Sequence, residues 1–347
     1  MPDNEVFKNI QKFFKLMVDN KVSLEPTPYD IVYHFEGMKL RRYRSDKRNS
    51  SLGPILFVYA LINKPSVLDL EPGKSVIEKY LNAGFDVFMI DWGNPTEVDI
   101  YTTIGDYVER YIRRAVRRVK SLSKSDKINL FGYCMGGTFS TMYATLHPEE
   151  IRTLTVMASP IAFPDESNSI LHVWPKHPDF PIEKIADTYK LVPPSFFNSA
   201  FYLLDPVGNG YLKYVNLYNM IGDDPAVENF LRMEYWTNDG IFMSGETYKE
   251  FLSNGYRNNM LVKNEWAING KKIRLNNIDM PTAVIVGDKD TLVDPRSTKA
   301  LLDHISSQKK KVFEFPSGHI GLAVSRKTHA NMWPEVIKWT AENSSNQ

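Results

Sequence analysis

Short apolar runs of strand length alternate with amphipathic segments along the first half of the chain. The apolar runs cover residues 55–62, 86–92, 128–134 and 151–160, and helical spacing of apolar residues marks 74–84 and 103–119. Strands buried on both faces read as nearly continuous apolar runs, and the helices between them supply the cover. This alternation predicts an α/β fold with a mostly parallel sheet and helices on both faces.

The rhythm breaks between residues 163 and 280, where aromatic residues and prolines are frequent, as in "LVPPSFFNSAFYLLDP". It resumes with a strand over 282–290, a helix over 297–305, a strand over 311–319 and a final helix over 333–343. We therefore predict one sheet domain with an inserted helical cap. Its predicted parts are an N-terminal helical segment (1–30), the first part of the core (31–162), the cap (163–280) and the second part of the core (281–347).

The stretch "GYCMGG" follows one of the predicted strands and contains the only cysteine, Cys134. Gly132 and Gly136 flank it with the G-x-nucleophile-x-G spacing of a nucleophile elbow, a strained strand-to-helix turn that requires small residues on both sides. The start of the following helix would favour a thiolate there. The glycine pattern alone fits a buried structural cysteine equally well.

The order of the acidic residue and the histidine favours catalysis. In folds with this elbow, the acid and then the histidine follow the nucleophile, each at the carboxyl end of a late strand. His319 is the one histidine at such a position, and Asp290 is preferred to Asp288 because it lies at the turn where a carboxylate can reach an imidazole. Asp294 precedes a proline and a predicted helix, which is typical of a helix cap.

The composition of the chain bears on its partners and on the compartment in which it works. The 347 residues include 42 lysines and arginines against 41 aspartates and glutamates, so no overall charge favours nucleic acid or an acidic membrane. The start of the chain lacks the features of a secretory signal, and no apolar run approaches the roughly 20 residues of a membrane span. A single cysteine excludes a disulfide within the chain. We expect a cytoplasmic protein without a membrane span.

Several segments in this order resemble the polyhydroxyalkanoate synthases, specifically the short catalytic subunits of the class III and class IV enzymes. They are "VYALINKPSVLDL", "DVFMIDWGNP", "LFGYCMGG" and "PSGHIG". The resemblance implies an α/β-hydrolase fold with Cys134 as nucleophile, His319 as base and Asp290 as the acid. One departure is Thr291, because the family often has a histidine directly after the aspartate.

The resemblance also implies a reaction and its participants. (R)-3-Hydroxyacyl-coenzyme A, with 3-hydroxybutyryl as the expected acyl group, would be polymerised through a cysteine thioester, with coenzyme A released and with no bound cofactor or metal. The backbone N–H groups of Met135 and, by position and resemblance, Ile62 would form the oxyanion hole. The implied partners are the growing polyester and a second synthase subunit, and the implied location is a cytoplasmic polyester granule. A homo-oligomer is left open.

Two other functions stay open from the sequence. A cysteine hydrolase of the dienelactone hydrolase type has a motif similar to "GYCMGG", although such chains are much shorter and lack the long cap. A non-catalytic subunit that retained the fold is the third reading, and the presence of Cys134, Asp290 and His319 argues against it.

Overall fold

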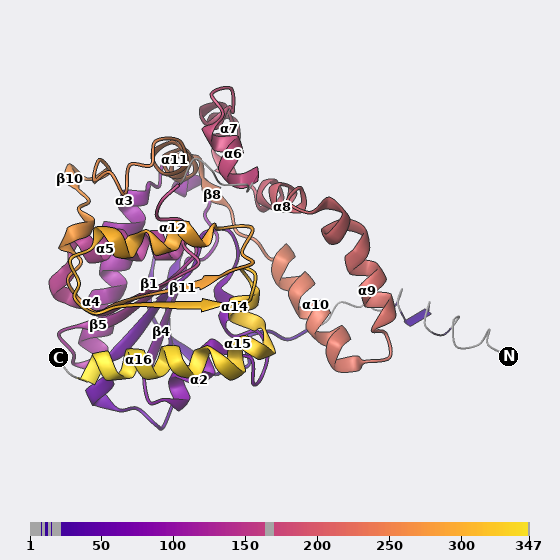
Figure 1. Ribbon diagram of the computed structural model, residues 1–347, viewed down its shortest axis with the longest axis horizontal. Coiled ribbons are helices and arrows are strands. Elements are labelled where there is room, and N and C mark those ends of the chain that lie inside the picture. The colour runs from indigo at the N-terminus through magenta and orange to yellow at the C-terminus, as the bar shows by residue number, and fades with distance from the viewer. Residues whose placement is uncertain (1–7, 9–10, 13–14, 16–21, 164–169, 346–347) are drawn as a thin grey trace.

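The computed structural model describes residues 8, 11–12, 15, 22–163 and 170–345, and its body is an eight-stranded sheet (Figure 1). The strand order is β1-β2-β4-β3-β5-β6-β11-β12. β1 and β2 run antiparallel to their neighbours, and the other strands are parallel. The strands are β1 (Tyr29–Phe35), β2 (Met38–Tyr43), β3 (Pro54–Val58), β4 (Asp86–Asp91), β5 (Ile128–Tyr133), β6 (Ile151–Met157), β11 (Thr282–Gly287) and β12 (Lys310–Phe315). The predicted mostly parallel sheet is confirmed.

Helices cover both faces of this sheet, since every residue of β3, β5 and β11 is buried. From β3 to β4 the chain moves along the sheet in one direction, and from β4 to β5 and on to β6 it moves in the other. Because crossovers between parallel strands are right-handed, α2 lies on one face of the sheet and α4 and α5 lie on the other. α16 packs against α2. The covering helices are α2 (Val76–Asn82), α3 (Ile104–Asp106), the π-helical η4 (Tyr107–Ile112), α4 (Arg113–Ser123), α5 (Met135–Leu146), α12 (Pro295–Lys299), α13 (Leu301–His304), α14 (Gly321–Val324), α15 (Arg326–Asn331) and α16 (Trp333–Ser345).

The antiparallel hairpin β1–β2 is a feature that the apolar pattern did not predict. β1 lies at the sheet edge and is half exposed, so its sequence lacks a continuous apolar run. On β2, the buried Arg41 forms ion pairs with Glu25 and, at 2.6 Å, with Asp91. The predicted N-terminal helical segment lies largely outside the described residues, and β1 already begins at Tyr29.

Between β6 and β11 the chain forms a series of helices, in the segment predicted as a cap. They are α6 (Ile170–Lys176), α7 (Ile182–Tyr189), α8 (Pro194–Tyr202), the π-helical η6 (Gly208–Leu212), α9 (Lys213–Asn219), α10 (Asp224–Asn238), α11 (Gly245–Glu250) and the π-helical η7 (Phe251–Arg257). α9 and α10 lie beside the body in Figure 1 and enclose a small core of Leu217, Val227 and Leu231.

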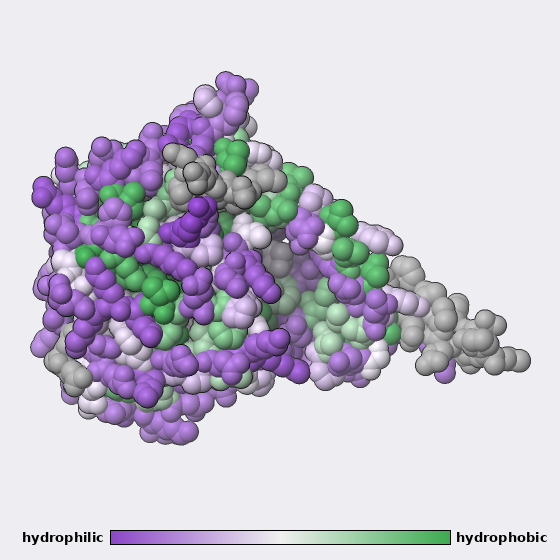
Figure 2. All heavy atoms as spheres, viewed as in Figure 1, coloured by the Kyte–Doolittle hydropathy of each residue, from purple (hydrophilic) through white to green (hydrophobic). Residues whose placement is uncertain are grey.

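Short elements complete the fold. Two-residue strands pair as β7 (Leu191–Val192) with β8 (Met243–Ser244) and β9 (Ala267–Ile268) with β10 (Lys271–Lys272). Single 3₁₀ turns are η1 (Ser50–Leu52), η2 (Pro65–Leu68), η3 (Glu97–Asp99), η5 (Pro148–Glu150) and η8 (Leu275–Asn277). Among the described residues, no helix combines the length and the apolar composition needed to cross a bilayer. Figure 2 shows apolar side chains on the visible face of α8 and α9.

Candidate active site

The carboxyl ends of the parallel strands β3, β5, β11 and β12 meet at one edge of the sheet, and the candidate residues lie in the turns that follow them. Cys134 occupies the turn from β5 to α5 with φ 56° and ψ −131°, a backbone conformation that is costly for any residue with a side chain. Its N–H donates to the carbonyl of Met157 at 3.0 Å, which ties the turn to β6. Such a strained turn lifts the thiol out of the sheet edge.

Steric contacts explain the two glycines of this turn. A Cβ at Gly132 would overlap the backbone of Gly137 and the carbonyl of Gly136, and a Cβ at Gly136 would overlap the carbonyls of Val58 and Tyr59. The start of α5 thus packs directly on the chain that leaves β3. This close approach brings the thiol beside the loop after β3.

We expect Gly136→Ala to destabilise the folded protein by more than about 2 kcal/mol, because rigid backbone atoms would have to move apart. The matched control is Gly222→Ala, since a Cβ there would meet no atom within 4 Å. Urea unfolding of both variants measures the difference. Equal stability of the two variants would show that the turn tolerates a side chain.

Asp290 and His319 come together across the ends of β11 and β12. Asp290 Oδ2 lies 2.7 Å from His319 Nδ1, and the exposed fractions of the two side chains are only 1% and 7%. The other carboxylate oxygen, Oδ1, accepts the backbone N–H groups of Leu292 and Val293, both at 2.9 Å. These bonds orient the carboxylate toward the imidazole.

The two other aspartates of this segment have different surroundings. Asp288 is exposed. Asp294 accepts the N–H of Arg296 at 2.9 Å and caps α12, as predicted. Burial against the imidazole therefore distinguishes Asp290 from its neighbours.

His319 is electrostatically tuned by this environment. Burial alone would lower the pKa of His319, but the Asp290 carboxylate, through its charge and its hydrogen bond to Nδ1, raises it to about 10, with a further contribution from the nearby Cys134 sulfur. The imidazole therefore favours the cationic form, which is the form that stabilises a neighbouring thiolate.

The raised pKa of His319 predicts a pH dependence of stability. Between pH 6.5 and pH 10 the folded protein keeps a proton on His319 that the unfolded chain has lost. The free energy of unfolding should therefore fall as pH rises through this window, by up to about 1.4 kcal/mol per pH unit from this group. The NMR chemical shifts of the His319 imidazole across this range measure the titration of this group in the folded protein, separately from the Cys134 thiol. A midpoint near pH 6.5 would contradict the raised pKa.

Two backbone N–H groups stand as candidate oxyanion donors. Met135 is the first residue of α5, and the first N–H groups of a helix have no acceptor within the helix. Ile62 lies in the loop after β3, residues 59–64, and lines both cavities that reach Cys134. The strand β3 ends at Val58, four residues before the end of the predicted strand 55–62, and the residues that follow form this loop.

Two cavities of different character meet at Cys134. A cavity of about 370 Å³ is lined almost wholly by aromatic and aliphatic side chains, most of them from residues 171–256, among them Phe197, Tyr248 and Tyr256. A larger cavity of about 730 Å³ also contains His319 and has a mixed polar and apolar lining, which includes Thr291. Cys134 and His319 are each only 8% exposed. The arrangement suits an apolar acyl group bound in a site with little water.

Two residues that hold parts of the candidate site in place were not predicted from the sequence. Tyr133, within the elbow motif, donates its hydroxyl to the carbonyl of His319 at 2.9 Å, and burial raises its pKa so that it stays a donor. Trp92, within "DWG", donates its indole N–H to the carbonyl of Tyr59 at 3.0 Å and supports the loop 59–64. Both residues lie inside distinctive motifs, which could have marked them as important, but no pattern in the sequence indicated what they would contact.

Other histidines have separate surroundings. His147 contacts Glu109 at 2.5 Å, and His329 contacts the carbonyl of Ala323 at 2.6 Å. Burial lowers the pKa of His329 to about 4. Within the part of the chain that the structure describes, no three histidine, cysteine, aspartate or glutamate side chains gather as a metal site would require.

Solved structures and a family model identify the fold. The model of the alpha/beta hydrolase fold matches residues 53–325. A soluble variant of monoglyceride lipase from Saccharomyces cerevisiae is similar with a TM-score of 0.59 and 15% identity, over 93% of this chain and 96% of that one. The structure of DcsB in complex with a substrate analogue is similar with a TM-score of 0.57 and 17% identity, over 92% of this chain and 99% of that one. These likenesses confirm the predicted α/β-hydrolase fold.

Proteins of similar sequence show to which family within this fold the chain belongs. The chain is 43% identical to the poly(3-hydroxyalkanoate) polymerase subunit PhaC of Haloferax mediterranei over 94% of its own length and 66% of that protein's length. It is 40% identical to the protein of the same name from Haloarcula marismortui, over 95% of this chain and 71% of that protein. It is 36% identical to the protein of that name from Synechocystis, over 91% of this chain and 85% of that protein. Together with the fold, these relatives place the chain in the family of the poly(3-hydroxyalkanoate) polymerase subunit PhaC.

Proposed function

We propose that this chain is the catalytic subunit of a polyhydroxyalkanoate synthase. It would join (R)-3-hydroxyacyl units, 3-hydroxybutyryl first among them, into a polyester and release coenzyme A. The observation that carries the proposal is the position of Cys134 at a strained elbow between two cavities, next to a histidine that is bonded to a buried carboxylate. The relatives named above support the substrate class.

In the first half of the reaction, the thiolate of Cys134 attacks the carbonyl carbon of the acyl-coenzyme A thioester. The N–H groups of Met135 and Ile62 donate to the oxygen that becomes negative. The bond from carbon to the coenzyme A sulfur then breaks, and that sulfur leaves with the proton of the His319 imidazolium. One thioester replaces another, so the acyl group keeps its reactivity.

In the second half, the neutral His319 takes the proton from the 3-hydroxyl of another hydroxyacyl unit. The resulting oxygen attacks the thioester carbon on Cys134, an ester bond forms, and the carbon–sulfur bond breaks to restore the thiolate and imidazolium. Asp290 keeps the imidazole oriented and stabilises its cationic form through the 2.7 Å contact at Nδ1. Each cycle therefore lengthens the polyester by one ester bond.

The two cavities suit the two ends of the substrate. The apolar cavity, walled by cap residues, would receive the acyl group and the growing chain. The larger cavity with its mixed polar and apolar lining would receive the pantetheine part of coenzyme A. The low exposure of Cys134 and His319 favours an alcohol of the substrate over water as the second nucleophile.

A second synthase subunit and a polyester granule in the cytoplasm complete the proposal. The name of the relatives describes them as subunits. The cap also exposes large apolar side chains near α9, which isolated soluble proteins usually cover: Leu203, Val207, Tyr211 and Leu212. We propose that the second subunit covers this surface and raises the activity. The chemistry requires no cofactor, because coenzyme A leaves as a product.

The test is incubation of the purified chain with (R)-3-hydroxybutyryl-coenzyme A, with and without a second subunit from the same type of system. Release of free coenzyme A together with insoluble polyester supports the proposal. Release with only soluble hydroxybutyrate would indicate a hydrolase of the dienelactone hydrolase type. No release of coenzyme A, even with the second subunit, would indicate a non-catalytic subunit.

A further inference from the structure

The loop 59–64 is held by the carboxyl end of the cap helix α10 as well as by the body. The N–H of Ile241 donates to the carbonyl of Ile62 at 2.9 Å, and the indole N–H of Trp236 donates to the carbonyl of Lys64 at 2.9 Å. Lys64 also forms an ion pair with Asp239 at 2.7 Å. The cap thus fixes peptide groups on either side of Asn63, directly next to the candidate oxyanion donor.

Asn63 makes this contact reciprocal. Its side-chain amide is 7% exposed and donates to the carbonyls of Trp236 at 3.4 Å and Thr237 at 3.3 Å. The last carbonyls of a helix lack the usual partner within the helix, and Asn63 donates to two of them, although the carbonyl of Trp236 also accepts the N–H of Asp239 at 3.2 Å. Asn63 thus helps to cap α10, and α10 in turn holds the Asn63 side chain. A buried amide that lost these acceptors would be unsatisfied, which penalises separation of the loop from the helix.

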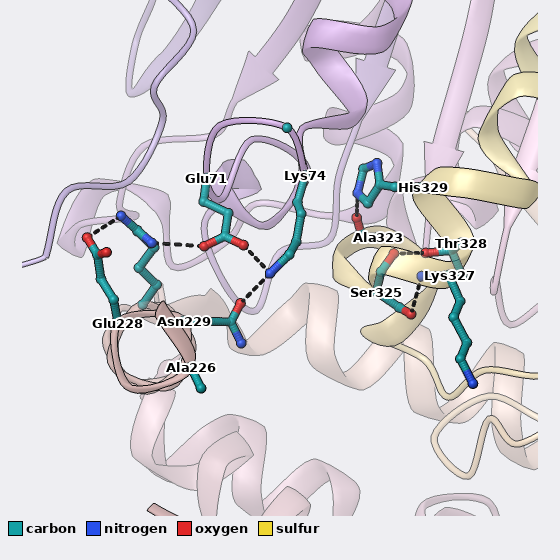
Figure 3. A network of polar contacts seen from close by, with 12 residues as sticks. Glu71, Lys74, Ala226, Glu228, Asn229, Ala323, Ser325, Lys327, Thr328 and His329 are labelled. Carbon is teal, nitrogen blue, oxygen red and sulfur yellow. Dashed lines mark hydrogen bonds and ion pairs between the residues drawn. The ribbon is translucent and has the colours of Figure 1, made fainter. Parts of the chain in front are cut away.

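A second anchor holds α10 to the body one turn earlier. Arg232 forms an ion pair with Glu71 at 2.8 Å, with exposed fractions of 12% and 11% for the two side chains. Figure 3 shows Glu71 and Lys74 facing the helix that carries Asn229, and Lys74 Nζ lies 3.3 Å from the side-chain oxygen of Asn229. Both anchors reach the chain that follows β3. α10 is therefore seated on the same segment that carries Ile62.

We infer that α10 positions the oxyanion donor Ile62, with Asn63 and Trp236 as positioning residues. The inference rests on the proposed function, since Ile62 has this role only if Cys134 forms a tetrahedral adduct. It follows that acyl transfer is fast only while α10 is seated on the body.

The test separates attack on a carbonyl from attack on a saturated carbon. Acylation of Cys134 by (R)-3-hydroxybutyryl-coenzyme A needs the oxyanion donors, whereas alkylation of Cys134 by iodoacetamide needs only the thiolate. For Trp236→Phe, which keeps the ring and loses the indole N–H, we expect acylation to slow about 10- to 100-fold. The rate of alkylation should stay as in the wild type. Asn63→Ala should behave in the same way.

The matched control is Asn238→Ala, because the Asn238 amide donates to the carbonyl of Glu234 within α10 and reaches no part of the loop. Circular dichroism and thermal unfolding check that every variant is folded. Folded Trp236→Phe and Asn63→Ala proteins that acylate as fast as the wild type would overturn the inference and leave the proposed function intact. Equal loss of acylation and alkylation would also overturn it. A wild-type chain that releases no coenzyme A, with or without a second subunit, would instead remove the proposed function itself.

Discussion

Cys134→Ser is expected to reduce polyester formation at least about a thousand-fold. A serine hydroxyl is a weaker nucleophile than a thiolate and holds its proton beside His319. If it were acylated, the product would be an ordinary ester, and its transfer to an alcohol would lack the driving force of a thioester. Release of coenzyme A and the yield of insoluble polymer measure the loss.

The fold of this variant should be preserved. The change from sulfur to oxygen is small, and the turn geometry depends on Gly132 and Gly136 and on the bond from the Cys134 N–H to Met157. Circular dichroism and thermal unfolding check this point. Polymerisation by a folded Cys134→Ser protein at nearly the wild-type rate would contradict a covalent thioester.

Asp290→Asn is expected to lower the rate of acylation by about 10³- to 10⁴-fold. The asparagine oxygen can still accept the N–H groups of Leu292 and Val293, so its NH₂ group would then face His319 Nδ1. An amide donor at that position favours the wrong tautomer and removes the charge that stabilises the imidazolium. Single-turnover release of coenzyme A measures the effect.

Asp288→Asn is the matched control for this prediction, because Asp288 lies two residues earlier and is exposed. It should acylate like the wild type. If both variants were equally active, Asp290 would have no part in the reaction, and the buried contact with His319 would be structural.

Local patterns were sufficient to predict much of this molecule. The glycines around Cys134 predicted a strand-to-helix turn that requires small residues, and the structure places Gly132 against Gly137 and Gly136 against the carbonyls of Val58 and Tyr59. Buried strands such as β5 and β11 could be predicted because every residue in them is buried, which leaves continuous apolar runs. Asp290 and His319 were selected by chain order, since parallel strands bring their carboxyl ends to one edge.

Features that depend on distant contacts could not be predicted in this way. The edge hairpin β1–β2 escaped because its exposed face interrupts the apolar pattern and Arg41 is buried only through its ion pairs with Glu25 and Asp91. The contact between Asn63 and Trp236 joins residues 173 positions apart. No periodicity or motif in the sequence relates one of these residues to the other, so the packing of α10 against the loop 59–64 became apparent only from the structure.

The most direct test of covalent catalysis by Cys134 is the chemical identity of the acyl-enzyme. The chain is mixed with (R)-3-hydroxybutyryl-coenzyme A, quenched in acid within a single turnover, digested and analysed by mass spectrometry. A covalent thioester mechanism predicts that the peptide containing Cys134 gains the mass of one or more hydroxybutyryl units through a bond that neutral hydroxylamine cleaves, as it does a thioester. Release of coenzyme A with an unmodified Cys134, or with the acyl group on another residue, would contradict it.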